Sequence, residues 1–568
     1  MTSPVINTDA LVAKIHGSII GGDRVIQGPF GGRRLAYADY TASGRSLSFI
    51  EDFLRDRVLP YYANTHTETS LTGLQTAHYR EQARETIRCP IGADDDYAVI
   101  FCGAGTTGAI NRLIDILNIR IPSDLDARYD LSCHILADQR PVVLIGPYEH
   151  HSNELPWRES IADVVAIDED ADGRIDLGHL ERQLTLYRDR ELVIGSFSAA
   201  SNVTGIVSDI HAITTLLHDH GALNFWDYGA AAPYIGIDAT GRSSVGGERA
   251  AMDALFISPH KFPGGPGSPG VLVVGKELLV NRTPARPGGG TVAYVNTLEH
   301  VYIDNLEHRE EGGTPAIVES IRAGLVFQLK DSVGAAEIEA RDEIFLRRAF
   351  AVWRDNPNLH ILGNPDLKRL SIVSFVVRHG QQNLHHDFVV ALLNDLFGIQ
   401  SRGGCSCAGP YGHRLLDISL DQSRAFCDSI AQGCNGIKPG WTRLGFNYFF
   451  SGALTDYIIA AVDMVATHGW KLLPEYSFEP QSGVWRHRAM ADFAPMGLED
   501  VDILGPGQPP AETATEDALE GYLQAARDIF AQAGIRQTQC CATEAMGDDA
   551  ETLRWFPLPE DINQASAR

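Results

Sequence analysis

Short apolar runs alternate with helical patterns through the middle of the chain, and this alternation restricts the fold more than any other feature. Strand-like runs of four to six residues lie at 97–102, 141–146, 191–196, 222–226, 254–257 and 271–274. Between them, residues 110–117 place apolar side chains at i, i+3, i+4 and i+7, and residues 210–220 form a helical pattern that ends before a glycine. Apolar strands joined by helical crossovers predict a mainly parallel sheet with both faces covered. We therefore predict an α/β fold.

The pattern changes after this region. A long helical pattern at 335–353 precedes a strand at 370–377 and a helix at 388–397, which is typical of a smaller α+β domain. From about residue 472 the composition shifts to Pro, Glu, Asp and Ala. The predicted domains are an N-terminal segment (1–34), a large domain (35–330), a small domain (331–470) and a C-terminal extension of unknown role (471–568).

The extension contains one clear helical pattern, at 514–533, with Thr513 and Glu516 spaced as a capping box. A linker-like stretch, GPGQPP, precedes it at 505–510. The last 35 residues are expected to be a loosely structured tail.

Charge and cysteine content narrow the classes of partner. The chain has 47 Lys and Arg against 73 Asp and Glu, a net charge of −26, which argues against nucleic acid or an anionic membrane as a partner. Its apolar runs are too short to span a bilayer, and its first residues lack the pattern of a signal peptide. An odd count of nine cysteines indicates reduced thiols. We expect a cytoplasmic enzyme acting on a small molecule.

A glycine-rich segment, GAGTTG at 103–108, lies between a predicted strand and a predicted helix. Backbone N–H groups at a helix N-terminus attract phosphate, and Thr106 and Thr107 add hydroxyl donors. The alternative is a tight strand–helix turn without a ligand. The spacing matches neither a P-loop nor a dinucleotide fingerprint.

Two charged residues follow neighbouring strand patterns. Asp227 comes directly after the run at 222–226, where open α/β sheets bind ligands. Lys261 closes the sequence Ser-Pro-His-Lys after the run at 254–257, ahead of a Gly/Pro-rich stretch. A lysine in this position is a candidate for covalent bonding to a carbonyl compound. The alternatives without a function in catalysis are a turn residue for Asp227 and a solvated surface charge for Lys261.

The order of these motifs resembles class V of the pyridoxal 5'-phosphate (PLP) enzymes, and within it the cysteine desulfurase and selenocysteine lyase group. The matching segments include AGTTGAIN (104–111), EHHSNELPW (149–157), SNVTG (201–205), SPHK (258–261), REEGGTP (309–315) and SRGGCSCAGP (401–410). The resemblance implies fold-type I, with a seven-stranded, mainly parallel sheet in the large domain.

The resemblance also implies a role for each matched residue. Lys261 would bond covalently to PLP, and Asp227 would keep the ring nitrogen protonated so that the ring can accept electrons. His150 would stack on the ring, and Asn202 would contact the ring oxygen or the substrate carboxylate. The residues implied to surround the phosphate are Thr106, Thr107, Ser258 and His260.

Two further segments bear on assembly and substrate. By resemblance, Thr314 in REEGGTP touches the phosphate in a partner subunit, which implies a homodimer with shared sites. Arg443 matches the arginine that holds the α-carboxylate of an amino-acid substrate, and Arg402 is a second candidate.

The loop SRGGCSCAGP (401–410) indicates which reaction the enzyme catalyses. By resemblance, Cys407 would attack the substrate sulfur and carry it as a persulfide to a sulfur acceptor, and Cys405 lies two residues earlier. A Cys-x-Cys loop is otherwise a structural thiol or half of a metal site, and we predict no metal here because no Cys/His pair stands near it. His385 and His386 fit none of the motifs and are expected to be polar surface residues.

Two positions depart from the desulfurase pattern. Ala230 stands where these enzymes usually carry a glutamine that bonds to the cofactor's ring oxygen, and Ser406 replaces a frequent histidine. These departures leave two alternatives open. One is a PLP-dependent lyase, epimerase or aminotransferase that does not use Cys407, and the other is a non-catalytic scaffold.

Overall fold

The computed structural model describes residues 7–65, 67, 69–242, 250–490, 497–498, 511–533 and 546–565. The chain divides into two compact units, each built around its own sheet. The first comprises Met1–Ile19, Tyr40–Asp342 and Asp366–Leu370, and the second comprises Ile20–Asp39, Glu343–Pro365 and Ser371–Arg568. Helix α11 (Ala335–Trp353) begins in the first unit and ends in the second.

The first unit contains a seven-stranded sheet in the order β4-β10-β9-β8-β7-β5-β6. Strand β10 is antiparallel to both neighbours, and all other neighbouring pairs are parallel. The strands are β4 (Tyr97–Cys102), β5 (Val142–Ile145), β6 (Asp163–Ala166), β7 (Val193–Ser198), β8 (Leu223–Asp227), β9 (Ala254–Ile257) and β10 (Gly270–Gly275). This confirms the predicted α/β fold with its mainly parallel sheet. The edge strand β6 was missed because it is only half-buried and has no continuous apolar run.

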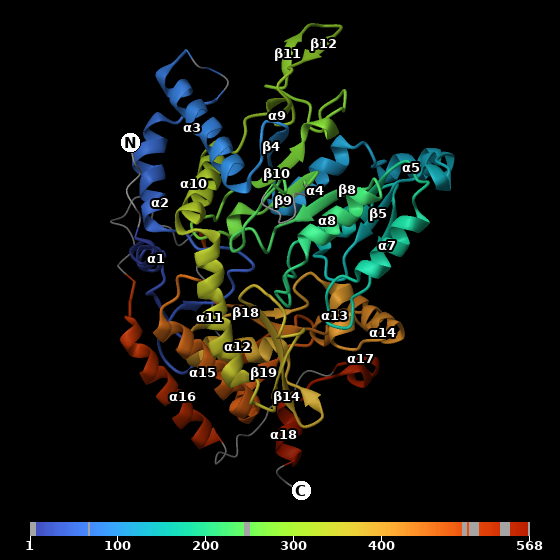
Figure 1. The fold of residues 1–568 in the computed structure, drawn as a ribbon. Coiled ribbons are helices and arrows are strands. Elements are labelled where there is room, and N and C mark those ends of the chain that lie inside the picture. Colours follow the sequence, from blue (N-terminus) through green and yellow to red (C-terminus); the bar gives the residue numbers. More distant parts are fainter. Residues whose placement is uncertain are drawn as a thin grey trace. The chain divides into compact units, whose positions relative to one another are not determined.

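Helices cover this sheet, as the ribbon in Figure 1 shows. The helices of the first unit are α1 (Thr8–Gly17), α2 (Ser48–Phe53), α3 (Leu71–Arg88), α4 (Gly105–Ile116), α5 (Ser123–Tyr129), α6 (Leu155–Arg158), α7 (Leu177–Leu186), α8 (Ile210–Asp219), α9 (Leu306–Arg309) and α10 (Ile317–Val333). The predicted helix at 110–117 is the inner face of α4, whose Leu113 packs with Ile100 and Phe225 in one fully buried cluster. Strands β11 (Val292–Val295) and β12 (His300–Tyr302) pair only with each other, as a separate hairpin.

The outer edge of β4 is capped by carboxylates instead of another strand. The backbone N–H groups of Val99 and Phe101 donate to Glu307 (2.7 Å) and Glu311 (2.6 Å). The Arg84 side chain, 1% exposed, pairs with Glu311 at 3.1 Å, and Arg80 also contacts it. Because unpaired edges invite association with other strands, these side chains both protect the edge and fix the segment around Glu311.

The second unit contains an antiparallel sheet in the order β13-β14-β18-β17. Its strands are β13 (Leu359–Ile361), β14 (Ile372–His379), β18 (Trp441–Gly445) and β17 (Arg402–Gly404), with β15 (Gln382–Asn383) on β14. Its helices are α12 (His386–Phe397), α13 (Gly409–Leu415), α14 (Leu420–Ala431) and α15 (Gly452–His468). A short strand near the N-terminus, β3 (Ala36–Tyr37), pairs in parallel with β16 (Ile399–Gln400).

The C-terminal extension folds against this unit and overturns two predictions. Its described elements are β19 (Tyr476–Phe478), β20 (Trp485–His487), α16 (Leu519–Ala533), α17 (Asp548–Leu553) and α18 (Pro559–Ala565). The His385 ring is 2% exposed and stacks on Trp555 with centroids 5.3 Å apart, while Phe556 is fully buried beside it. His385 and His386 are therefore buried, not polar surface residues, and residues 546–565 are not a loose tail. The stretch at 505–510 lies outside the described residues.

The predicted capping box at Thr513 and Glu516 is also wrong. Helix α16 begins at Leu519, after a single 3-10 turn. The Glu516 carboxylate instead accepts a hydrogen bond from the Ser451 hydroxyl at 2.6 Å, and Thr513 forms a bridge to Arg24. Glu516 and Thr513 therefore pair with residues distant in the sequence instead of capping the helix. The spacing of the two residues cannot reveal this.

Replacing Glu311 with Ala should lower the free energy of unfolding by about 3 kcal/mol, because Arg80 and Arg84 would lose their most buried counter-charge and keep only Glu81 and Glu307, at 3.2–3.6 Å. Urea unfolding followed by circular dichroism measures this change. The matched control is Glu343→Ala, which removes an exposed glutamate paired with Arg347 on α11 and should change stability by less than about 0.5 kcal/mol. Equal effects of the two substitutions would contradict the capping role.

Candidate active site

Asp227 and Lys261 come together because β8 and β9 are parallel neighbours. Asp227 is the last residue of β8, and Lys261 ends the 3-10 turn that follows β9. The Gly229 N–H donates to Asp227 Oδ1 at 2.7 Å. Burial raises the pKa of the Asp227 carboxyl, while the Lys261 charge and the Gly229 hydrogen bond oppose that rise. A buried carboxylate thus lies within electrostatic reach of the lysine.

The turn that carries Lys261 is held closely from its far side. The Gly44 N–H donates to the His260 carbonyl at 2.8 Å. A Cβ atom at Gly44 would lie 2.0 Å from the Phe262 carbonyl oxygen, so no side chain fits there. Burial, aided by the Lys261 charge, lowers the pKa of His260 to about 4, so the imidazole is neutral at physiological pH.

The first turn of α4 forms a cradle suited to an anion. Gly105 has φ +54°, and a Cβ atom there would lie 2.7 Å from the Ser258 hydroxyl. That hydroxyl accepts a hydrogen bond from the Thr106 N–H at 2.9 Å. The Thr107 residue is exposed. The same Cβ atom would lie 3.3 Å from His260 Nε2. All four residues predicted around the phosphate therefore meet at one helix N-terminus, where dipole and N–H groups favour negative charge.

His150 is tied to the same helix through a serine that sequence reasoning missed. The Ser152 N–H donates to His150 Nδ1 at 3.0 Å, and the Ser152 hydroxyl lies 2.9 Å from the same nitrogen. That hydroxyl also lies 2.6 Å from the Thr107 hydroxyl. The only signal in the sequence was the position of Ser152 within EHHSN. Asn202, also predicted at the site, is buried after β7.

A second buried carboxylate, Glu149, precedes His150 and was also missed. It accepts hydrogen bonds from the Ser198 N–H (2.8 Å), the Ser198 hydroxyl (2.6 Å) and the Asn153 amide (2.7 Å). Burial raises the pKa of Glu149 to about 7, although those hydrogen bonds oppose the rise. The negative charge of Asp227 adds to it. Glu149 fastens the segment that bears His150 to strand β7.

In the second unit, the two predicted arginines share one carboxylate. Arg443 Nη2 lies 2.8 Å from Asp39 Oδ1, and Arg402 Nε lies 3.3 Å from Asp39 Oδ2. The Arg443 side chain is 3% exposed and that of Arg402 is 46% exposed. Burial lowers the pKa of Arg443, and the Asp39 charge and hydrogen bond oppose this. Sequence reasoning missed Asp39, because nothing in its neighbourhood marks it as a partner of residues about 400 positions away.

The cysteine loop leaves β17 as a tight turn. The Ala408 N–H donates to the Cys405 carbonyl at 3.1 Å, and the two central residues, Ser406 and Cys407, have φ of 52° and 56°. Left-handed conformations at both central positions define a type I′ turn, which normally favours Gly or Asn. Cys405 and Cys407 are exposed, whereas Ser406 is buried. The turn thus presents both thiols to solvent.

Thr314 lies at the end of a segment fastened to the first unit. Buried Glu310 accepts from the Asn281 amide (2.8 Å) and the Ala285 N–H (2.9 Å). Thr314 itself is exposed, and its hydroxyl accepts from the Asn64 amide at 3.2 Å. Ala230 is buried in the turn after Asp227.

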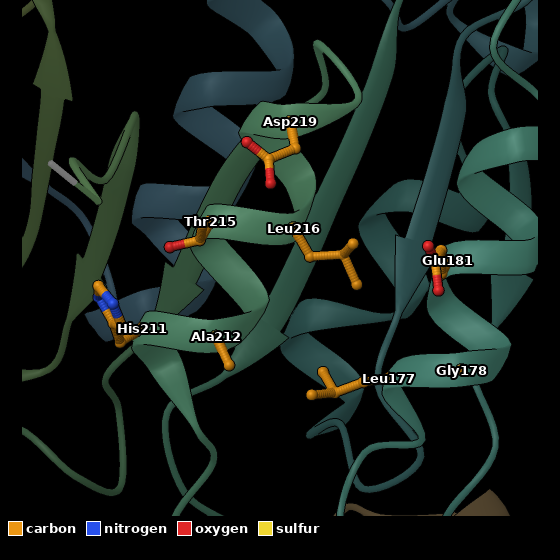
Figure 2. Close-up of a pocket in the computed structure, with 8 residues that line it drawn as sticks. All are labelled: Leu177, Gly178, Glu181, His211, Ala212, Thr215, Leu216 and Asp219. Atoms are coloured by element: carbon orange, nitrogen blue, oxygen red, sulfur yellow. The ribbon is translucent and has the colours of Figure 1, made fainter. Parts of the chain in front are cut away.

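Two other features, a histidine–aspartate cluster and a surface groove, contain no predicted site residue. His385, His386 and Asp387 offer ligand atoms within 4.8 Å of one another, yet both His385 nitrogens are engaged, by the Asp387 N–H and the Gly436 carbonyl. Figure 2 shows an open groove between α7 and α8, where Leu216 points toward α7. The lining residues are Leu177, Gly178, Glu181, His211, Ala212, Thr215, Leu216 and Asp219.

Comparison with known proteins places the chain in a family. Residues 36–423 match the sequence profile of the family described as "Aminotransferase class-V". The chain belongs to this family. A probable cysteine desulfurase of Halalkalibacterium halodurans is 27% identical over 72% of this chain and 94% of its own length. A probable cysteine desulfurase of Staphylococcus aureus is 26% identical over 74% of this chain and 94% of its own length.

Solved structures show the same fold. An apo cysteine desulfurase of Thermococcus onnurineus aligns with a TM-score of 0.63 at 21% identity, covering 82% of this chain and all of its own. A cysteine desulfurase of Escherichia coli aligns with a TM-score of 0.57 at 20% identity, covering 75% of this chain and 93% of its own. The first unit is therefore the fold-type I sheet of the class V family. No helix among the described residues is long and apolar enough to cross a bilayer.

The family implies PLP, and the first unit has groups that fit it. The buried Asp227 carboxylate suits a protonated ring nitrogen, and Lys261 is close enough to influence the Asp227 pKa. Gly105 leaves space that a Cβ atom would fill, at a helix N-terminus suited to phosphate. The residues that would hold the group are Thr106, Thr107, His150, Asn202, Asp227, Ser258, His260 and Lys261.

Glu149 should make stability depend on pH. The folded protein keeps the Glu149 proton up to about pH 7, whereas an unfolded chain releases it near the ordinary value of 4.5. The stabilisation from the protonated form is therefore complete below about pH 4.5 and is lost as the pH rises through about 7. In Glu149→Gln, the free energy of unfolding should fall less between about pH 5 and pH 8 than in wild type. Denaturant titrations across this range test it, and parallel curves for the two proteins would refute it.

Proposed function

We propose that this protein cleaves the C–S bond of an amino acid in a cysteine desulfurase-like reaction, with Cys407 as the acceptor of sulfur. The observation that carries the proposal is the exposed Cys407 thiol in a turn that follows directly from the strand of Arg402. Its relatives named probable cysteine desulfurase support it at 26–27% identity over most of their own length.

Each step of this reaction has a residue in the chain. Arg443, with a planar fork of N–H donors, would hold the α-carboxylate of the substrate. When bound, PLP supplies an electron sink for the negative charge that forms at Cα. Lys261 would take the proton from Cα, and Asp227 would hold the ring proton in place.

Cys407 would then act as the nucleophile. Its thiolate forms a bond to the substrate sulfur as the bond between that sulfur and Cβ breaks. The electron pair of the broken bond remains with the carbon fragment, which takes up protons and leaves as alanine. Cys407 is left as a persulfide, whose outer sulfur passes to an acceptor thiol.

A second candidate is a class V lyase, epimerase or aminotransferase that leaves Cys407 idle. Ala230 in place of the usual glutamine, and Ser406 in place of histidine, favour it. It needs Lys261 and Asp227 but no thiol. A non-catalytic scaffold would have no need of a carboxylate buried beside a lysine, a costly arrangement for structure alone.

Replacing Cys407 with Ala should reduce the release of alanine and sulfide from L-cysteine by at least about two orders of magnitude, while the visible absorbance of bound cofactor stays unchanged. The matched control is Cys427→Ala, which removes another exposed thiol, on α14, and should keep full activity. Full activity in Cys407→Ala would favour the second candidate. Wild type without visible absorbance would favour the scaffold.

We also propose that the protein is a homodimer in which Thr314 completes the partner's site. Thr314 is exposed at the end of a segment anchored by buried glutamates, as such a role requires. The nearby hairpin of β11 and β12 exposes apolar side chains that a monomer would leave in water: Tyr294, Val295, Leu298 and Val301.

The expected mass in solution is twice the 61.9 kDa of one chain. Light scattering coupled to gel filtration measures it. Mixing inactive Lys261→Ala with Thr314→Ala should restore part of the activity, because one site of each mixed dimer would then have both residues intact. A monomer, or a mixture no more active than its components, would refute shared sites.

A further inference from the structure

Two arginines face each other across neighbouring strands of the second unit. Arg402 of β17 is directly opposite Arg443 of β18 in the antiparallel register. Like charges in such a pair repel each other and destabilise the strand pairing. Asp39 lies between them, 2.8 Å from Arg443 and 3.3 Å from Arg402. The Asp39 carboxylate therefore offsets the repulsion between the two arginines at the start of β17, the strand that leads into the cysteine loop.

Asp39 is held in this position by its backbone. The Ala38 N–H donates to the Gln400 carbonyl at 2.9 Å, and the Gly445 N–H donates to the Ala38 carbonyl at 2.7 Å. The Tyr37 hydroxyl donates to the Asp39 carbonyl at 3.2 Å. The segment is thus fastened on both sides, and Asp39 cannot move away from the arginines without breaking these hydrogen bonds. Its charge is a fixed part of the site.

The charges of this cluster leave one net positive charge, because two guanidinium groups face a single carboxylate. Of the two arginines, Arg402 is the one that reaches solvent, with 46% of its side chain exposed. Cys407 lies in the tight turn that continues β17 beyond Gly404, and its charge also acts on Arg443. A molecule approaching Cys407 therefore meets a site balanced for one negative group.

We propose that Asp39 is a specificity-determining residue that restricts this site to amino acids with one carboxylate and an uncharged side chain. A single α-carboxylate neutralises the remaining charge of the two arginines. A second acidic group on the substrate would meet Asp39 with no cation left to balance it. This assignment of substrate class rests on the proposed function, whereas the charge balance itself does not.

The charge balance is tested by alkylating Cys407 in the full-length protein. Iodoacetate carries one negative charge and iodoacetamide carries none, so the ratio of their rates reports the local potential. The background variant is Cys405→Ser, and mass spectrometry of the peptide assigns the alkylation to Cys407. In Asp39→Asn, this rate ratio should rise by about three- to tenfold, because the site then carries one more positive charge, which attracts the anionic reagent. The rise should disappear at about 1 M salt, where the screening length is about 3 Å.

Two variants separate the effect of charge from damage to the loop. Arg402→Gln should lower the ratio, and Arg402→Gln combined with Asp39→Asn should return it to the starting value, because the net charge is again one. The matched control, Glu343→Gln, removes an exposed negative charge on α11 and should leave the ratio unchanged. An unchanged rate ratio in Asp39→Asn would overturn the proposal, and so would a double variant whose ratio does not return to the starting value.

The substrate class is tested with L-cysteine and L-cysteine sulfinate, which adds a second acidic group. In Asp39→Asn, kcat/KM for the sulfinate relative to L-cysteine should rise by about three- to tenfold. If wild type cleaves neither compound, the proposed function fails, and the alkylation ratios still decide the charge balance. If both are cleaved and the preference does not change, Asp39 does not set the specificity.

Discussion

The parallel pairing of β8 with β9 is the constraint on which the chemistry of the first unit depends. It places the end of one strand beside the turn after the next, so that Asp227 and Lys261 meet although 33 residues separate them in the sequence. β7 pairs with β8 in the same direction and places Ser198 opposite Asp227. Ser198 in turn holds Glu149 and hence the segment of His150. Three strand ends thus bring these polar groups to a single edge of the sheet.

Buried or half-buried carboxylates hold segments together in both units. Glu311 ends the edge of β4, Glu149 joins two strand ends, and Asp39 joins two arginines. In each case donors surround the carboxylate, which is the condition under which a buried charge is tolerable. The same groups hold segments that carry candidate functional residues, so the polar interior and the site are parts of one arrangement.

The C-terminal extension belongs structurally to the second unit. Trp555 and Phe556 cover His385, and the Trp555 ring N–H donates to the Ile437 carbonyl at 3.0 Å. Trp555 and Phe556 lie beyond the part of the chain that matches the family profile, which ends at residue 423. Their packing over His385 explains why a histidine pair that resembles surface sequence is buried.

Local sequence determined the α/β class, six of the seven strands of the large sheet and the order of the motifs, because buried parallel strands require continuous apolar runs. It also pointed to Asp227 and Lys261, since both directly follow such runs. The edge strand β6, the burial of His385 and the roles of Ser152, Glu149 and Asp39 were decided by tertiary structure alone. Each depends on partners distant in the sequence, or on burial that no local pattern records. Asp39 shows this most clearly, because its two partners lie 363 and 404 residues away and only strand pairing brings all three charges together.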